Sequence, residues 1–206
     1  MYKKFFKRLI DIELSLLGII VLIIPMLVIA LIIRIDSPGA VFFKQERVGK
    51  NKKPFTILKF RSMRTDTPKD VPTHLLSNPD AYITKIGKFL RRTSLDELPQ
   101  IFCIFVGTMS IIGPRPALYN QEDLIAERDK YGANDIRPGL TGLAQIKGRD
   151  ELPIDVKAAL DGEYVKKLSF WFDVKLFFGT IISVLKSDGV VEGGTGTLEK
   201  EESAVK

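Results

Sequence analysis

Hydrophobic residues are concentrated in two segments, one near each end of the chain. Residues 14–33 contain no charged side chain and consist mostly of Leu, Ile and Val. A run of this length is long enough to cross the hydrocarbon core of a bilayer. It is also longer than the apolar part of a signal peptide, and no small-residue cleavage site follows it. We therefore expect residues 1–35 to form a membrane-inserted helix.

Two features leave the path of this helix open. Pro25 lies near its middle, where it lacks a donor N–H and clashes with the carbonyl group of Val21. Lysines and arginines flank the segment on both sides, and such residues favour the cytoplasmic side of a membrane. A helix that breaks at Pro25 and re-enters the same leaflet satisfies both observations. A spanning helix with a kink is the alternative.

The second apolar segment covers residues 169–186 and contains six aromatic or large aliphatic residues in its first ten positions. Its polar residues Asp173, Thr180 and Ser183 form a narrow stripe at helical spacing. Asp173 and Lys175 interrupt the apolar run, so a membrane crossing is not expected. The segment is either a core helix or a helix that lies along the membrane interface, and its aromatic residues favour the interface.

The region between the two segments predicts a small domain of mixed secondary structure. Residues 41–45 and 54–61 alternate in polarity around a glycine-containing loop, which indicates a β-hairpin. Helical patterns follow, at residues 81–92, 94–106, 117–131 and 151–168. We therefore predict an α+β fold, a mostly helical single domain over residues 36–188 with a small β-hairpin or sheet. Its membrane contacts are the N-terminal helix broken at Pro25 and interfacial amphipathic helices, and residues 189–206 are expected to form a flexible tail.

Charge and composition restrict the kinds of ligand and functional site that the chain can have. The chain has 206 residues and a formal net charge of +6, so its surface should attract phosphates, nucleic acid or acidic lipid. No nucleic-acid-binding module is recognisable, and the apolar segment argues against a nucleic-acid partner. The single cysteine, Cys103, excludes an internal disulfide and a cysteine-based zinc cluster. The single histidine, His74, lies in a proline-rich loop, so a site built from several histidines is excluded as well.

The stretch from Ser94 to Gln100 (Ser-Leu-Asp-Glu-Leu-Pro-Gln) is the candidate for chemistry. Ser94 and Glu97 have the spacing of a capping box, which predicts an ordinary helix start. At 100° per residue, however, Asp96 points away from the apolar stripe of that helix and is free to face a cleft or water. Two adjacent carboxylates that follow Arg91 and Arg92 also suit a phosphoryl-transfer site.

Glycine- and arginine-rich turns follow this stretch. Arg115 lies between two prolines, in Gly113-Pro114-Arg115-Pro116, and residues 136–149 contain a second group of glycines and arginines. Glycine permits close backbone approach to a ligand, and arginine offers planar donors to phosphate. Neither group forms a Walker loop or a dinucleotide fingerprint. On this evidence alone, plain surface turns are the simpler interpretation.

Together, the motifs resemble a known family over nearly the whole chain. The resemblance is to the bacterial sugar transferases, the small monotopic phosphoglycosyl transferases, in their minimal form without additional membrane helices. Six blocks occur in the family's order, which is more specific than any one block. They are Lys7-Arg8-x-x-Asp11, Lys59-Phe60-Arg61-Ser62-Met63, Arg91 with Ser94 to Gln100, Met109-Ser110-x-x-Gly113-Pro114-Arg115-Pro116, Arg137-Pro138-Gly139-x-Thr141-Gly142-x-Ala144-Gln145 with Gly148-Arg149, and Asp161-x-x-Tyr164 with Asp173-x-Lys175.

The resemblance implies a reaction and a site. A phosphosugar passes from a nucleoside diphosphate sugar, usually a UDP-sugar, to polyprenol phosphate, with UMP as the second product. Asp96 would be the nucleophile and form a covalent phosphosugar intermediate, and Glu97 together with Asp96 would hold Mg²⁺. Substrate contacts are expected from Lys59, Arg91, Arg115, Arg137, Gln145, Arg149 and Asp161.

The resemblance also implies a location and a biological role. The catalytic domain would lie on the cytoplasmic face of the bacterial inner membrane, against anionic lipid, and would begin glycoconjugate assembly. A non-catalytic scaffold that docks on anionic lipid is the alternative function.

Physical chemistry agrees with a carboxylate nucleophile. A carboxylate attacks phosphorus without a general base, which suits a chain with one histidine. A hard cation relieves the repulsion between two adjacent carboxylates. One conflict follows for Glu97, because a side chain that caps the helix is less free to hold a metal ion.

Overall fold

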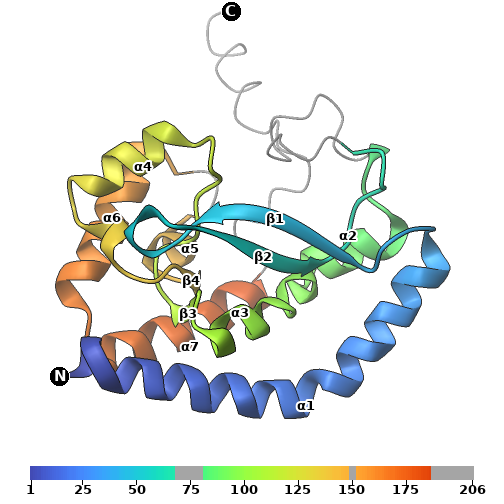
Figure 1. Ribbon diagram of the computed structural model, residues 1–206, viewed down its shortest axis with the longest axis horizontal. Helices are drawn as coiled ribbons and strands as arrows, with labels where there is room; N and C mark the ends of the chain where they lie inside the picture. Colours follow the sequence, from blue (N-terminus) through green and yellow to red (C-terminus); the bar gives the residue numbers. More distant parts are fainter. Residues whose placement is uncertain (68–80, 149–151, 187–206) are drawn as a thin grey trace, which may run out of the picture.

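The computed structural model describes residues 1–67, 81–148 and 152–186 (Figure 1). Helices predominate in the described part, which also contains two small two-stranded sheets, so the predicted α+β class is confirmed. The α-helices are α1 (Lys7–Asp36), α2 (Lys85–Arg92), α3 (Gln100–Val106), α4 (Glu122–Asp129), α5 (Leu143–Lys147), α6 (Ile154–Lys167) and α7 (Phe170–Lys186). The strands are β1 (Phe42–Val48), β2 (Pro54–Phe60), β3 (Ser110–Ile112) and β4 (Gly139–Thr141). Shorter helical turns are η1 (Tyr2–Phe6), η2 (Lys50–Lys52), η5 (Leu95–Glu97) and η6 (Ala133–Asp135).

The predicted hairpin is confirmed. β1 and β2 pair antiparallel, with Phe42 opposite Phe60 and Val48 opposite Pro54. The turn between them contains Asn51, whose φ of 54° is a left-handed conformation that asparagine adopts more readily than most residues. The hairpin carries Lys59 toward the interior of the domain, where its side chain meets η5.

The second sheet was not predicted, and its strand β4 lies within residues 136–149, which the sequence suggested were turns. β3 and β4 pair parallel, and Gly139 packs so closely on Gly113 that a Cβ atom at Gly139 would lie 2.1 Å from the Gly113 nitrogen. Gly142 has a similar constraint, because its Cβ would lie 2.2 Å from the Gly113 oxygen. These two glycines therefore serve close contact between two backbones, not the close approach to a ligand that the sequence suggested.

α1 runs beneath the rest of the molecule and bends in its middle (Figure 1). Pro25 lies inside it, yet the helix continues as one element from Lys7 to Asp36, so the proline bends the helix and does not break it. Within the described residues, this is the one helix long and apolar enough to cross a membrane. The re-entrant path stays a prediction.

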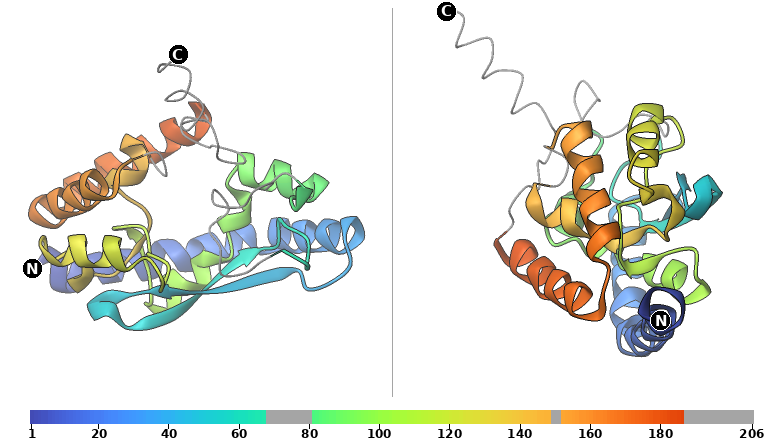
Figure 2. Two further views of the ribbon diagram at one scale, coloured as in Figure 1. Left: turned by 90° about the horizontal axis from the view of Figure 1, so that it is seen from above. Right: turned by 90° about the vertical axis from the view of Figure 1, so that its left-hand side faces the viewer.

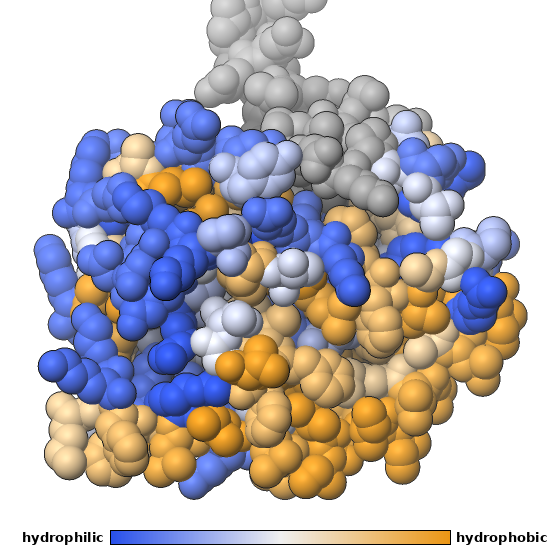
Figure 3. Space-filling view, in the orientation of Figure 1, coloured by the Kyte–Doolittle hydropathy of each residue, from blue (hydrophilic) through white to orange (hydrophobic). Residues whose placement is uncertain are grey.

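α1 and α7 both turn polar residues inward and apolar residues outward. α1 buries Asp11 and Ser15 and leaves most of its leucines and isoleucines exposed. α7 buries Asp173 and Ser183, whereas Trp171 is 76% exposed. A helix in a water-soluble protein shows the opposite arrangement. The outward apolar surface of α1 forms the lower edge of the molecule (Figure 3). For α7, the exposed aromatic and aliphatic side chains favour an interfacial position over a core position.

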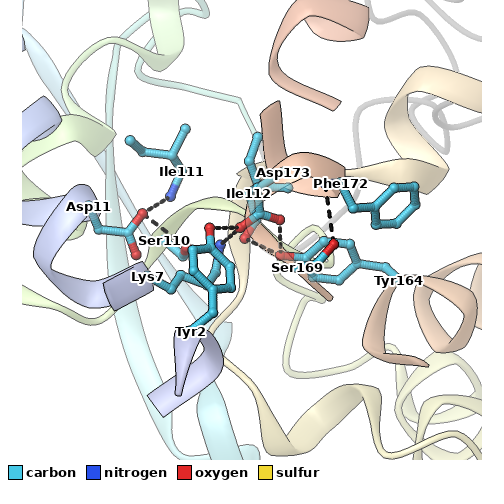
Figure 4. A network of polar contacts seen from close by, with 10 residues as sticks. All are labelled: Tyr2, Lys7, Asp11, Ser110, Ile111, Ile112, Tyr164, Ser169, Phe172 and Asp173. Carbon is cyan, nitrogen blue, oxygen red and sulfur yellow. Dashed lines mark hydrogen bonds and ion pairs between the residues drawn. The ribbon is translucent and has the colours of Figure 1, made fainter. Parts of the chain in front are cut away.

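A buried polar network ties the N-terminal end of α1 to α7 (Figure 4). The two oxygens of Asp173 accept hydrogen bonds from Tyr2 and Lys7, at 2.6 Å each, and from Tyr164 at 2.8 Å. One turn further along α1, the carboxylate of Asp11 accepts a hydrogen bond from the backbone N–H of Ile111 in β3. The start of α1 is thereby fixed to two elements of the domain.

Arg61 fixes the other end of α1. It is 6% exposed, and its guanidinium donates hydrogen bonds to the backbone oxygens of Ser37 and Pro38 at 2.7 and 2.6 Å. Charged side chains at the end of a strand are usually solvated, but Arg61 is buried. Both ends of α1 are thus anchored to the domain.

Some predictions lie outside the described residues. His74, Arg149 and residues 189–206, the expected tail, belong to this group. The boundaries proposed at residues 35 and 188 stay predictions.

We predict that Asp173→Ala lowers the free energy of unfolding by about 3 kcal/mol, because Lys7 would lose its counter-charge in a largely buried position. The side chains of Lys7 and Asp173 are only 13% and 9% exposed. The fluorescence of Trp171, the single tryptophan, reports thermal unfolding of the detergent-solubilised protein. Lys52→Ala is the control, because it removes an exposed ion pair with Asp129 and should cost less than about 1 kcal/mol. Equal losses in the two variants would contradict the structural role of Asp173.

Candidate active site

A cavity of about 1250 Å³ lies between the hairpin, α1, α3 and α7. Six of the predicted site residues line it, although they come from five different elements or loops. They are Lys59 of β2, Arg91 of α2, Asp96 and Glu97 of η5, Arg115 after β3, and Gln145 of α5. The fold therefore assembles most of the site that the resemblance implied.

The backbone before the two carboxylates makes a sharp turn. Ser94 has φ 57° and ψ 16°, a left-handed conformation that is unfavourable for serine. The three residues of η5 follow, and the regular helix α3 begins only at Gln100. The side chain of Ser94 makes no capping hydrogen bond, so the predicted capping box is wrong. The turn directs the two neighbouring side chains to different surroundings.

Glu97 is the centre of a three-residue ion cluster. Its Oε1 atom accepts hydrogen bonds from Lys59 Nζ at 2.6 Å and from Arg115 Nη2 at 2.7 Å. Burial alone would raise the pKa of Glu97, but the charges of Arg115 and Lys59 outweigh this effect and hold the pKa well below its usual range. Glu97 is therefore an anion that joins β2, η5 and the loop after β3, and it does not cap a helix.

Asp96 differs from its neighbour in its contacts. It is 9% exposed and lines the cavity, yet no described residue donates a hydrogen bond or an ion pair to its carboxylate. Burial raises its pKa, the charge of Lys59 opposes that shift, and the charge of Glu97 adds to it. Asp96 is thus a carboxylate whose oxygens are available to a molecule in the cavity.

Gln145 lines the cavity, but its amide nitrogen and oxygen are themselves buried. The residue is 9% exposed, and neither amide atom has a hydrogen-bond partner among the described residues. Buried amides normally have partners, so this pair is an exception. The expected substrate contact of Gln145 stays a prediction.

Other predicted residues lie elsewhere. Arg137 is not among the residues that line the cavity, and its Nε atom donates a hydrogen bond to the Gly107 oxygen at the end of α3. Asp161 is buried behind the cavity wall, where its Oδ2 atom accepts hydrogen bonds from Nε and Nη2 of Arg128. Burial raises the pKa of Asp161, and the charge of Arg128 opposes that shift. In this structure, Asp161 thus holds Arg128 and does not itself reach the cavity.

Arg128 is a cavity residue that sequence reasoning missed. It is 4% exposed, and it lines the cavity through its position on α4. In the sequence it is one charge among many in a helix of alternating charges, so no pattern distinguished it. Only the partner Asp161, thirty-three positions away, shows that it points inward.

The acidic residues of the cavity determine how well a metal ion would fit. In the described part of the chain, no group of three or more His, Cys, Asp or Glu side chains is close enough to hold one. Mg²⁺ usually keeps several waters and binds one or two carboxylates together with substrate phosphates. Asp96, whose carboxylate has no protein partner, fits this type of site when a diphosphate is present. Glu97 fits less well, because two cations already share its Oε1 atom.

Comparison with known proteins places these residues in a family context. A family model described as bacterial sugar transferase matches residues 2–187. The exopolysaccharide production protein PSS of Rhizobium leguminosarum bv. phaseoli is 42% identical over 193 residues, which cover 87% of this chain and 94% of that protein.

Two longer relatives carry more specific names. The UDP-glucose:undecaprenyl-phosphate glucose-1-phosphate transferase of Escherichia coli (strain K12) is 43% identical over 183 residues, which cover 85% of this chain and 39% of that protein. The UDP-galactose-lipid carrier transferase of Erwinia amylovora is 37% identical over 206 residues, which cover 90% of this chain and 42% of that protein. The chain thus spans about two fifths of the length of each of these two relatives.

We predict that Asp96→Asn raises the melting temperature at pH 7.5. A carboxyl group whose pKa is raised by folding stabilises the protein only below its pKa in the unfolded chain, and that contribution is lost as the pH rises through the folded-state pKa. The neutral amide avoids the loss, and we expect a gain of about 2–4 °C, or roughly 1 kcal/mol, that shrinks toward pH 4.

The measurement is thermal unfolding in EDTA at both pH values. Asp66→Asn is the control, because the hydrogen bond from Arg64 lowers the pKa of that exposed carboxyl group and no gain is expected. A destabilised Asp96→Asn protein at pH 7.5 would contradict the assignment of an unpartnered buried carboxylate.

Proposed function

The chain belongs to the bacterial sugar transferase family, and on this basis we propose that it transfers a phosphosugar from a UDP-sugar to polyprenol phosphate. The products are a polyprenyl-diphosphate-sugar and UMP. The names of two relatives support this reaction, because one specifies UDP-glucose and undecaprenyl phosphate and the other UDP-galactose and a lipid carrier. The contrast between Asp96 and Glu97 is the observation that carries the proposal: a cavity-facing carboxylate without a partner beside one held by two cations.

The first step uses Asp96 as the nucleophile. One of its carboxylate oxygens attacks the β-phosphorus of the UDP-sugar, and the bond from that phosphorus to the bridging oxygen breaks. UMP leaves with the electron pair, and the phosphosugar is bound to Asp96 as an acyl phosphate. No proton has to be removed from a carboxylate, so this step needs no general base.

The second step regenerates Asp96. A phosphate oxygen of polyprenol phosphate attacks the phosphorus of the acyl phosphate, and the carboxylate of Asp96 leaves. The new bond is the diphosphate linkage of the product. Both steps occur at one phosphorus atom, so the same positive groups serve twice.

The cations of the site lower the main barrier to the reaction, which is the repulsion between anionic reactants. Lys59 and Arg115 are held on one oxygen of Glu97, and Arg91 lines the same cavity. In this proposal Glu97 keeps Lys59 and Arg115 in position for the diphosphate, so neither side chain has to be ordered when the substrate binds. Bound Mg²⁺ would neutralise phosphate charge beside Asp96.

The location follows from the apolar surface of α1 and α7. We propose that these helices hold the domain at the cytoplasmic face of the bacterial inner membrane, where its basic surface meets anionic lipid. The reaction would there be the first membrane step of glycoconjugate assembly. The sugar is left open, since the two relatives are named for glucose and for galactose.

We predict that Asp96→Asn lowers the rate of UMP release by at least about 1000-fold, because the amide is not a nucleophile toward phosphorus. The assay screens several UDP-sugars with polyprenol phosphate and Mg²⁺. Mass spectrometry of the wild-type protein should find a phosphosugar on the peptide that contains Asp96.

The control is Asp155→Asn, which changes an exposed aspartate on α6 and should leave the rate unchanged. Substantial turnover by Asp96→Asn would exclude the covalent mechanism. If the wild-type protein released no UMP with any donor, the scaffold function would replace the enzymatic one.

We also predict that removal of divalent cations stops the reaction and that added Mg²⁺ restores it. The reason is that Asp96 and a diphosphate repel each other, and the described cations are partly neutralised by Glu97. UMP release in excess EDTA, and after titration with Mg²⁺, checks this. Full activity in EDTA would show that the protein's own cations suffice.

A further inference from the structure

The cavity that contains Asp96 has an apolar part that the sugar nucleotide does not explain. We call this part the apolar chamber and define it by six lining residues from three helices. They are Leu14, Gly18 and Val21 of α1, Ile101 of α3, and Ile181 and Val184 of α7. A UDP-sugar carries hydroxyl, phosphate and imide groups, and none of these gains from a hydrocarbon wall.

The chamber lies beside the surface that we assign to lipid. Val21 and Ile181 line the cavity and are 62% and 42% exposed. Their sequence neighbours Ile20 and Ile182 are exposed too but do not line the cavity. The apolar wall of the cavity therefore adjoins the outward apolar surface along both α1 and α7.

The arrangement of α1 and α7 explains how the chamber forms. The two helices are joined near their N-terminal ends by the contacts of Tyr2 and Lys7 with Asp173. From there α7 diverges from α1 (Figure 2, left). The lining residues of α7 lie beyond the junction, from Phe177 to Val184, where the separation has grown.

The contact between α1 and α3 sets the floor of the chamber. A Cβ atom at Gly18 would lie 2.4 Å from Cδ1 of Ile101, so the two helices touch directly at this point. The lining passes from these apolar residues to Leu98 and then to Asp96 and Glu97. One cavity thus connects the reactive carboxylate with the lipid-facing surface.

We propose that the apolar chamber receives the first isoprenoid units of the acceptor lipid, so that its phosphate reaches Asp96 from the membrane side. This inference rests on the proposed function. Transfer of a hydrocarbon chain from bilayer to chamber exchanges one apolar environment for another, so the chamber adds little affinity. The chamber keeps the hydrocarbon chain of the acceptor out of water while the phosphate moves to the cations around Asp96. The polar part of the cavity remains for the UDP-sugar.

The test uses tryptophan substitutions in matched pairs. Val21→Trp and Ile181→Trp fill the chamber, whereas Ile20→Trp and Ile182→Trp add the same side chain to the outer apolar surface. We expect the two chamber variants to raise the KM for a long-chain polyprenol phosphate at least tenfold and to leave the KM for the UDP-sugar unchanged. The outer variants should behave like the wild-type protein. Equal effects of inner and outer substitutions would overturn the proposal.

A second readout separates this proposal from the proposed function. Without acceptor, the covalent mechanism gives one UMP per protein molecule, and the chamber variants should keep this burst because the first step does not use the chamber. Absence of the burst in the wild-type protein would refute the covalent mechanism. If the wild-type protein gave the burst and the chamber variants did not, the chamber would also serve the first step, and the proposal that it receives only the acceptor would be wrong.

A binding experiment tests the occupant without any turnover. The probe is a polyprenyl phosphate with a diazirine on its first isoprenoid unit, incorporated into vesicles of phosphatidylethanolamine and phosphatidylglycerol. Illumination should label peptides from α1 and α7, and unlabelled polyprenol phosphate should compete, whereas extra phosphatidylglycerol should not. If extra phosphatidylglycerol suppressed the labelling as strongly as unlabelled polyprenol phosphate does, the chamber would hold bulk lipid and the proposal would be overturned.

Discussion

The arrangement of the site depends on the carboxylate of Glu97, which is not the proposed nucleophile. Glu97 receives Lys59 from the hairpin and Arg115 from the loop after β3, and it lies on the turn that also carries Asp96. Three segments that are distant in sequence therefore meet at one oxygen atom. Without that anion, the two cations would repel each other in a partly buried place, and the turn would lose its ionic contacts with β2 and with the loop after β3. The adjacent carboxylate is unpartnered because Glu97 takes the nearest cations.

Buried polar groups also position the two apolar helices, α1 and α7. Asp11, Ser15, Asp173 and Ser183 of these helices are buried against the domain. The backbone of β3 donates to Asp11, and Tyr2, Lys7 and Tyr164 donate to Asp173. Both helices can then present their leucines, isoleucines and aromatic residues outward. The polar stripe of α7 thus fixes the orientation of the helix.

Sequence reasoning predicted those features that depend on local patterns. The hairpin, the long apolar helix and the helix after Gln100 follow from alternation, run length and helical spacing. The capping box was wrong because Ser94 adopts a left-handed conformation, and the carboxylate of Glu97 binds cations from elsewhere in the chain. Such long-range pairs leave no trace in a local pattern.

Family resemblance identified the site residues better than spacing did, but it did not sort them by position. Lys59, Arg91, Arg115 and Gln145 line the cavity, whereas Arg137 binds the end of α3. Both Arg115 and Arg137 occur in similar Arg-Pro sequences. Their different places depend on the pairing of β3 with β4, which brings one loop to the cavity and the other to the end of α3. Only the three-dimensional arrangement distinguishes them.

The anchoring of α1 at both ends has a mechanical consequence. Asp173 holds its start and Arg61 holds its end, so the helix cannot tilt or slide without moving the whole domain. In the proposed membrane-bound arrangement, the depth at which α1 settles would therefore fix the height of Asp96 above the lipid headgroups. A thicker, thinner or more curved bilayer would shift that height, and the distance that an acceptor phosphate must travel would shift with it. Under the proposed mechanism, the physical state of the membrane would then be one of the variables that set the rate of the second step.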